Sequence, residues 1–422
     1  MDTKKVYFEE RVDPYRVGIF SNGPNLPTGY AKVVREISSR LANDNDFEVI
    51  IFNENGGDGA VGEWQGIPVY NLSLPVISYG ENPTYDRTHV AESFMNISKE
   101  LNLDVVIFLE DSFTLRNFGF EGAIQTMFKR IFYIPLDGGW IPETGINVIR
   151  TMDKLVAMSV FTQNNLSREG FDSDVIWHGV NLELFSPVSK EKQAQLKIKH
   201  GFNPDDFIVF NYGRNSNSRK NNQSLLWIMS KYLSTAPDNH KFFMHTLEPE
   251  FAGNNLFDYV SRHLNIEFGK GVTDRLIFSP YRFNNAPQDS QVAEMIQLSD
   301  LVVTASSGEG FGLLMAEAMA CGKPIISTDY TTPHELLIDS SDEFPIGPRG
   351  WVVPVADTNV SGLNTEHAFV DKEAFVSILR DAVSNPDEIT ARGLNGRYFA
   401  EVNLNWDYLV ESWKQQIRDL VR

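Results

Sequence analysis

The sequence predicts an α/β protein built from two doubly wound domains, and three observations lead to that prediction. Short apolar runs of strand length alternate with segments of helical periodicity along the whole chain. This alternation ends near residue 187 and then starts again. The 422 residues, of which 42% are hydrophobic, suit two or three domains that each bury a core.

The first half of the chain opens with a strand–helix–strand unit. A strand is predicted at 15–21, a turn-rich segment at 22–29, a helix at 30–41 and a second strand at 47–52. Units of this kind form parallel sheets with helices on both faces. Further buried strands are predicted at 104–109, 130–134, 154–158 and 175–177. We therefore expect an N-terminal Rossmann-like domain over residues 1–186.

The second half repeats this pattern and predicts a second Rossmann-like domain over 187–400. Its predicted elements are the strand 207–212, the helix 222–232, the strands 242–245, 276–278 and 301–304, the helix 311–320 and the strand 324–327. From 406 to 420, apolar residues recur on one helical face. We expect residues 401–422 to form a terminal helix that packs back on the N-terminal domain.

Composition and charge exclude several classes of protein. The net charge of −19 argues against a protein that coats nucleic acid. Cys321 is the single cysteine, which excludes an intrachain disulfide and a cysteine-rich metal site and fits a reducing compartment. The first residues lack the apolar core of a signal peptide, and no stretch is apolar for long enough to span a bilayer. We therefore expect a soluble, cytoplasmic protein.

Three loops are candidates for a ligand site, because ligands of open α/β sheets bind beyond the carboxyl ends of the strands. They span residues 22–30, 213–222 and 306–312. The third loop is the most informative, since Gly308, Gly310 and Gly312 allow a close backbone approach and can point amide groups at an anion. The helix expected near Phe311 adds about half a positive charge at the same place.

Two carboxylates flank this predicted anion site. Glu309 precedes the helix, and Glu317 lies in its second turn, on the order of 9 Å along the axis. Carboxylates bind anions poorly but accept hydrogen bonds from sugar hydroxyls. The pair could instead be a helix cap and a solvated side chain. Within this glycine-rich loop we favour recognition of hydroxyl groups on either side of a bound diphosphate.

The second loop supplies cations. Arg214, Arg219 and Lys220 cluster there in an otherwise acidic chain, and phosphate is the natural partner of such a group. A solvated turn that balances nearby acids is the alternative. The first loop, with Pro27 and Gly29, is a weaker indication because many turns of this kind contain proline and glycine.

With these residues in view, the chain resembles the GT-B-fold retaining glycosyltransferases of family GT4, known as group 1, including bacterial, bacteriophage and viral members. The most specific match is Glu309 through Glu317, which fits the E-x7-E motif of the family. Arg214 with Lys220 fits its Arg…Lys pair. The resemblance implies two Rossmann-like domains facing a central cleft, with the acceptor on the N-terminal domain and a nucleotide-sugar donor on the C-terminal one.

The resemblance also implies residue roles. Arg214 and Lys220 would hold the donor diphosphate and stabilise charge on the leaving nucleotide. Glu317 would accept hydrogen bonds from the ribose, and Glu309 would contact the transferred sugar. Gly29 would close over the diphosphate from the N-terminal domain. The backbone against the sugar and diphosphate would be that of Gly310, Phe311, Gly312 and Leu313.

The sequence departs from the family in two places. Many members carry a histidine near the donor sugar, after a strand of the N-terminal domain, and here Asp137 is the best match for that position. Retention by a front-face route, in which the leaving phosphate takes the acceptor proton, needs no separate base. The second departure is the segment 330–335, where glycines are common in the family.

Donor, acceptor and metal are predicted more coarsely. The donor is expected to be a UDP- or GDP-sugar, with Tyr281 and Arg282 on the nucleobase side. The acceptor is expected to be a hydroxyl of a glycan, lipid or protein, and a hydroxylated DNA base, as for phage-type enzymes, is the alternative. We expect no metal or further cofactor, because the D-x-D patterns at 44–46 and 172–174 precede strands and lie away from the ligand edge.

Two other functions remain open for this architecture. A nucleotide-sugar epimerase would isomerise the donor without any acceptor. A non-catalytic nucleotide-sugar sensor would bind the donor without turnover.

Overall fold

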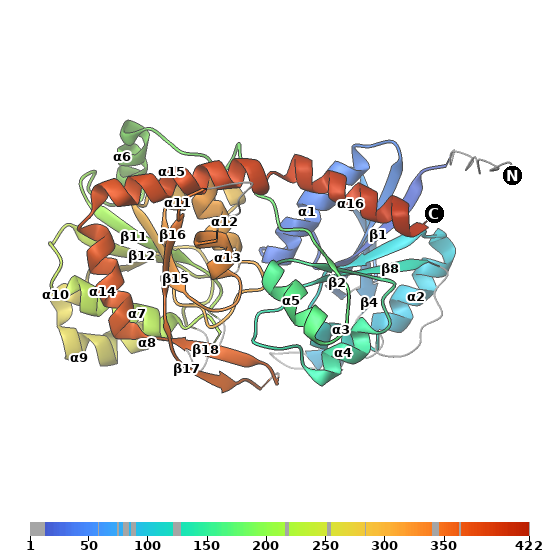
Figure 1. The fold of residues 1–422 in the computed structure, drawn as a ribbon, viewed down its shortest axis with the longest axis horizontal. Helices are drawn as coiled ribbons and strands as arrows, with labels where there is room; N and C mark the ends of the chain where they lie inside the picture. The colour runs from blue at the N-terminus through green and yellow to red at the C-terminus, as the bar shows by residue number, and fades with distance from the viewer. Residues whose placement is uncertain are drawn as a thin grey trace, which may run out of the picture. The chain divides into compact units, whose positions relative to one another are not determined.

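The computed structural model describes residues 13–57, 59–73, 76–78, 84–85, 90–120, 128–215, 219–250, 255–282, 284–339, 346–362 and 364–421. The chain divides into two compact units, each discontinuous in sequence. Unit 1 comprises Met1–Tyr133, Thr144–Leu155 and Val410–Arg422, and unit 2 comprises Ile134–Glu143 and Val156–Leu409. The domain limits expected from the sequence stay a prediction. Figure 1 shows the helices and strands of each unit.

The first sheet has eight strands in the order β10-β9-β8-β7-β1-β2-β4-β3. Its strands are β1 (Tyr15–Ser21), β2 (Phe47–Gly57), β3 (Val61–Trp64), β4 (Ile67–Ser73), β7 (Val105–Phe108), β8 (Lys129–Ile134), β9 (Lys154–Ala157) and β10 (Asp174–Val175). The central strand β1 pairs in parallel with both β2 and β7. A separate two-stranded sheet joins β5 (Val76–Ser78) and β6 (Thr84–Tyr85). Strands β3 to β6 were not predicted from the sequence.

The helices between these strands in chain order are α1 (Gly29–Ala42), α2 (Val90–Leu101), α3 (Ser112–Asn117), α4 (Glu143–Ile149) and α5 (Val160–Arg168), of which α5 belongs to unit 2. Thr28 caps α1, because its side chain accepts a hydrogen bond from the Ala31 N–H. The apolar spacing read from the sequence is the buried face of α1, formed by Val33, Val34, Ile37 and Leu41. This face covers β1 and β2.

The second sheet has six strands in the order β13-β12-β11-β14-β15-β16, and each neighbouring pair is parallel. They are β11 (Phe207–Tyr212), β12 (His240–His245), β13 (Leu276–Phe278), β14 (Leu301–Thr304), β15 (Ile325–Thr328) and β16 (Gly350–Val353). This is the 3-2-1-4-5-6 order of the Rossmann fold, and it reverses direction between β11 and β14. An antiparallel hairpin, β17 (Val355–Val360) and β18 (Glu366–Val370), follows.

From residue 190 onward the chain forms the helices α6 (Lys190–Lys199), α7 (Asn222–Leu233), α11 (Asp289–Leu298), α12 (Leu313–Ala320), α13 (Pro333–Leu337), α14 (Lys372–Val383), α15 (Pro386–Asn403) and α16 (Trp406–Val421). Four short segments, α8 (Leu256–Tyr259), the π-helix η1 (Val260–Leu264), α9 (Asn265–Phe268) and α10 (Lys270–Thr273), lead into β13. Apolar residues of helices α7 and α14 form one buried cluster with Val209 and Phe242 of the sheet.

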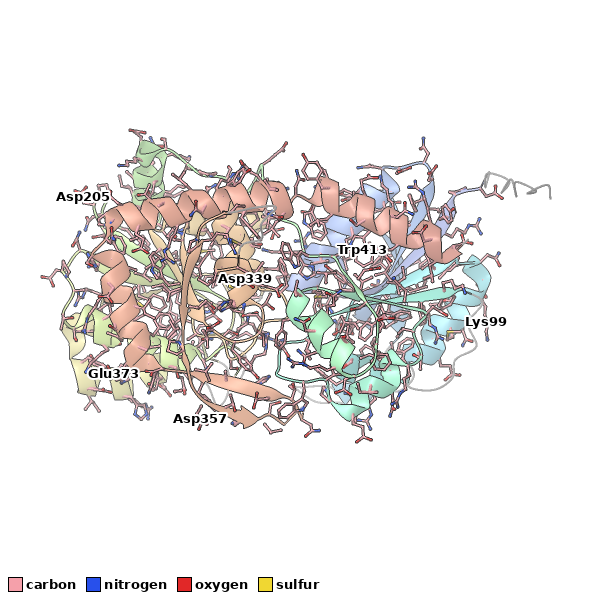
Figure 2. All side chains as sticks on the ribbon, in the orientation of Figure 1. Lys99, Asp205, Asp339, Asp357, Glu373 and Trp413 are labelled. Atoms are coloured by element: carbon pink, nitrogen blue, oxygen red, sulfur yellow. The ribbon has the colours of Figure 1, made fainter. Side chains whose placement is uncertain are left out.

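From Val410 onward, α16 belongs to unit 1. Trp413, labelled in Figure 2, is fully buried and meets the Tyr133 ring edge-on, with centroids 4.8 Å apart. Lys414 pairs with Asp44 at 2.8 Å and Arg418 with Asp46 at 2.7 Å. The first D-x-D pattern therefore anchors this helix. None of the described helices combines the length and apolar character that a membrane crossing needs.

Candidate functional site

The candidate site lies where the second sheet reverses strand order. The loops that follow β11 and β14 leave the carboxyl ends of two adjacent strands, which is where open α/β sheets bind ligands. These loops begin at Gly213 and Ala305 and are the second and third loops selected from the sequence. Residues 216–218 of the first of them lie outside the described part of the chain.

Two cations and two carboxylates form an ion-pair network here, which we call the Glu309 cluster. Lys220 Nζ lies 2.5 Å from Glu309 Oε1, and Arg219 Nη1 lies 3.7 Å from Glu309 Oε2. Arg219 Nε also lies 3.3 Å from Asp137 Oδ2. The Glu309 side chain is 13% exposed and that of Lys220 is 19% exposed, so both charges are largely removed from water.

Burial and charge act against each other in this cluster. Burial favours a raised pKa for Glu309, but the charges of Lys220 and Arg219 outweigh it and hold that pKa below its ordinary value. Burial lowers the pKa of Lys220, and Glu309 opposes that shift. The lowered pKa keeps Glu309 ionised at neutral pH, so it accepts hydrogen bonds and does not donate them.

Arg214, expected to pair with Lys220 on the diphosphate, has a different partner in the structure. Its side chain is 74% exposed, and its Nε lies 3.7 Å from Glu248 Oε2. Arg219, which the family motif does not include, contacts Glu309 instead. The sequence contained a signal for Arg219, because it stands beside Lys220 in the same basic loop.

The backbone of Glu309 is held by two threonines from the segment after β15. The Glu309 N–H donates to the Thr331 hydroxyl at 2.9 Å. The Thr332 hydroxyl donates to the Glu309 carbonyl at 2.6 Å. Thr331 has a φ of 66°, which is a strained conformation for a β-branched residue and one that glycine adopts freely. The positive φ explains why glycine is common in this segment of the family. In this chain Thr331 adopts that φ, and its hydroxyl accepts the hydrogen bond from Glu309.

Two glycines of the third loop are required for different reasons. A Cβ on Gly308 would lie 1.8 Å from the Asp137 carbonyl oxygen, so only glycine fits against that backbone. Gly312 has a φ of 103° and precedes the first residue of α12, Leu313. The helix therefore begins two residues after the expected Phe311. Gly310 also faces the segment Ile134–Glu143, with a virtual Cβ 3.2 Å from Pro135 Cβ.

Glu317 lies on α12 and is 3% exposed. Its Oε2 accepts a hydrogen bond from the hydroxyl of Tyr212, the last residue of β11. The spacing from Glu309 predicted Glu317, but no sequence pattern indicated Tyr212.

Asp137 has a histidine neighbour, His367, that no sequence pattern indicated. His367 of β18 is 6% exposed, and neither ring nitrogen has a hydrogen-bond partner among the described residues. Burial lowers its pKa, while Asp137 and Arg219 act on it in opposite directions. The hairpin is anchored nearby, since Gly139 N–H donates to the Glu366 carbonyl at 3.0 Å. No local pattern linked this hairpin to Asp137.

The remaining candidates lie at other positions. Tyr281 follows β13, and its ring meets His245 edge-on at 5.9 Å. Arg282 donates to the carbonyls of Ser279 at 3.1 Å and Tyr281 at 2.8 Å, which turns it toward its own loop. Gly29 is the first residue of α1 in unit 1.

His178 is a buried histidine of unit 2. It lies 4.8 Å from the Phe311 ring, and burial lowers its pKa to about 3. Within the described ranges, no group of three or more histidine, cysteine, aspartate or glutamate residues is arranged to hold a metal ion.

The chain has the GT-B fold, with two largely parallel α/β sheets, and solved structures of that fold superpose on nearly its whole length. Sucrose-phosphate synthase from Thermosynechococcus elongatus superposes with a TM-score of 0.75 at 18% identity, covering 96% of this chain and 99% of that chain. HepE from Anabaena, in complex with UDP and glucose, gives 0.69 at 15% identity, covering 96% of this chain and 100% of that chain. At these identities the likeness shows the fold.

The resemblance to group 1 glycosyltransferases that the motifs predicted is confirmed. Residues 281–360 match the family of glycosyl transferases group 1. EpsD of Bacillus subtilis, named as a glycosyltransferase, is 31% identical over 43% of this chain and 41% of its own length. D-inositol 3-phosphate glycosyltransferase of Gordonia bronchialis is 25% identical over 63% of this chain and 52% of its own length. The chain thus spans about half the length of the curated relatives it matches.

Proposed function

We propose that the protein is a retaining glycosyltransferase that moves a sugar from a nucleotide-diphosphate sugar to an acceptor hydroxyl. The observation that carries this proposal is the Glu309 cluster. It combines a carboxylate for sugar hydroxyls with two cations for phosphate, at the edge of the sheet where such ligands bind. Relatives with glycosyltransferase names and the group 1 family match support the same reaction class.

Charge development explains why the cluster suits this chemistry. The bond from the anomeric carbon to the phosphate oxygen breaks, and the bond to the acceptor oxygen forms on the same face. The acceptor proton passes to the leaving phosphate oxygen, which has gained about one negative charge. A donor placed to stabilise such charge contributes roughly 3–4 kcal/mol to lowering a barrier. Lys220 and Arg219, whose side chains are 19% and 32% exposed, are the candidates for this role, and the more exposed Arg214 could turn from Glu248 to join them.

Asp137 and Glu309 would then hold the sugar. In the structure they neutralise the same cations that a diphosphate needs. A bound diphosphate competes for Lys220 and Arg219, and the carboxylates become acceptors for sugar hydroxyls. These cations supply the charge neutralisation that a metal provides in other transferases, so we propose a reaction without metal. The nucleobase would lie toward Tyr281 and Arg282.

The donor is proposed to be a UDP-sugar. Solved structures of HepE, a protein of the same fold, contain UDP and UDP-glucose. For the acceptor we propose a glycan, lipid or protein hydroxyl. Transfer to a hydroxylated DNA base would weaken steeply with added salt, whereas transfer to a neutral sugar would not.

Thermal unfolding with added nucleotides tests the proposal. UDP, GDP, ADP and their sugar conjugates are each added at a fixed concentration. A ligand present at a hundred times its dissociation constant stabilises by about 2.7 kcal/mol, which shifts the unfolding temperature measurably. We expect one nucleotide to stabilise selectively, and Glu317→Ala to remove that shift. If none of these nucleotides moves the transition, the transferase proposal fails. Isomerisation of the donor alone would indicate the epimerase, and binding without turnover would indicate the sensor.

A further inference from the structure

Tyr212 and Glu317 form a contact across the strand-order reversal of the second sheet. Tyr212 is the carboxyl-terminal residue of β11, and Glu317 projects from α12, which follows the neighbouring strand β14. The Tyr212 hydroxyl donates to Glu317 Oε2. Because Glu317 is 3% exposed, the hydrogen bond lies in a region of low dielectric, where a bond to a charged acceptor is strong.

The Tyr212 ring is held in place by its neighbours. It pairs in register with His245 of β12, and the two ring centroids lie 6.4 Å apart. The Phe210 ring lies 6.3 Å away on the same strand. Burial, reinforced by the charge of Glu317, raises the pKa of Tyr212 well above its ordinary value. The hydroxyl therefore keeps its proton and acts as a donor.

A glutamate side chain has three rotatable bonds, so a buried carboxylate needs an outside contact to define its plane. The contact from Tyr212 supplies it at one oxygen. A carboxylate has about four acceptor positions, so one carboxylate can accept from a tyrosine hydroxyl and from ribose hydroxyls at the same time. Without the tyrosine hydroxyl, the carboxylate would be less well oriented toward those hydroxyls.

We propose that Tyr212 is the positioning residue for Glu317 and thereby sets the preference of this protein for ribonucleotides over deoxyribonucleotides. The inference rests on the proposed function, since it assigns the ribose of the donor to Glu317. It adds a specificity-determining residue that neither the glycine-rich loop nor the basic loop contains.

Titration calorimetry of the Tyr212→Phe variant tests the inference. The probes are the nucleoside diphosphate that stabilises the wild type most, from UDP, GDP and ADP, and its 2′-deoxy and 3′-deoxy counterparts. The substitution keeps the packed ring and removes one hydroxyl. We expect affinity for the ribonucleotide to fall about tenfold, a typical effect for a hydrogen bond to a charged group, with little change for the deoxynucleotides. The ratio of ribonucleotide to deoxyribonucleotide affinity in Tyr212→Phe should therefore approach the ratio in Glu317→Gln.

Tyr232→Phe is the matched control. Tyr232 is 3% exposed, and its hydroxyl bonds to His240 Nδ1 at 2.6 Å, at the opposite end of β12 from His245. The Tyr232→Phe variant loses a comparable hydrogen bond and should keep the wild-type ratio of ribonucleotide to deoxyribonucleotide affinity. Adding Tyr212→Phe to Glu317→Gln should change the ratio no further.

The outcomes separate the two proposals. If the wild type binds ribonucleotide selectively and Tyr212→Phe keeps that ratio, the positioning role is wrong and the proposed function stands. If the wild type binds none of the nucleotides, the proposed function fails and the positioning role fails with it.

Discussion

Replacing Lys220 by methionine removes the closest positive charge from Glu309 while keeping most of the side-chain volume. At an N···O distance of 2.5 Å and an effective dielectric constant near 20, the pair attraction is about 7 kcal/mol. Desolvation of the two ions offsets much of this, and removing one partner of a buried pair typically costs 3–5 kcal/mol. Because Arg219 remains 3.7 Å from Glu309, we expect the low end, about 3 kcal/mol.

The loss of unfolding free energy in Lys220→Met should grow as pH rises. In the wild type, the pKa of Glu309 lies below its ordinary value of 4.5, so its stabilising contribution is present above that pH and lost below it. In Lys220→Met, the charge of Lys220 no longer opposes the effect of burial, so we expect the pKa of Glu309 to rise. The variant therefore loses stability relative to the wild type as pH rises through the new pKa.

Urea unfolding of both proteins from pH 5.5 to 8.0 measures this difference and stays above the sequence pI of about 4.9, where solubility falls. Lys199→Met is the control, since the Lys199–Glu294 pair is more exposed and should contribute at most about 1 kcal/mol. A Lys220→Met penalty that is the same at both ends of this range would refute the electrostatic reasoning. The same variant should also turn over more slowly if the proposed function holds.

Two further predictions concern packing and protonation. Gly308→Ala would place a Cβ 1.8 Å from the Asp137 carbonyl oxygen, so we expect a loss of about 1–3 kcal/mol in urea unfolding and weaker nucleotide binding by calorimetry. Gly62→Ala, with no atom within 4 Å of the added Cβ, is its control, and equal losses in the two variants would contradict the clash. Burial raises the pKa of Glu335 to about 7, against the opposing backbone hydrogen bonds from Phe161 and Val160. An acid with a raised folded-state pKa makes stability fall as pH rises, here from about 4.5 to about 7, and Glu335→Gln should flatten that slope. A slope unchanged by the substitution would show that another group titrates.

Local patterns in the sequence were sufficient for much of the fold. The strands at 207–212, 276–278 and 301–304 have the predicted bounds, because buried parallel strands are short, continuous apolar runs. The buried face of α1 follows from its 3.6-residue period. The hairpin β17–β18 was missed, because β17 is mostly exposed and lacks such a run.

In the candidate site too, some features follow from local sequence patterns and others depend on the tertiary structure. The spacing from Glu309 to Glu317 and the basic loop at 213–222 are local, and the rule that ligands bind at strand ends is enough to connect them. The local sequence did not predict which arginine contacts Glu309. Arg214 and Arg219 are equivalent in composition, and only the path of the loop brings Arg219 to the carboxylate and leaves Arg214 exposed beside Glu248.

Periodicity and short spacing within single segments were enough to predict the fold class, the two loops of the candidate site and its pair of glutamates. The contact between Tyr212 and Glu317 and the place of His367 near Asp137 appear only in the folded structure. These contacts depend on strand order and on how a distant hairpin packs. The free energy that selects such an arrangement is spread over the whole core, so no short segment contains it.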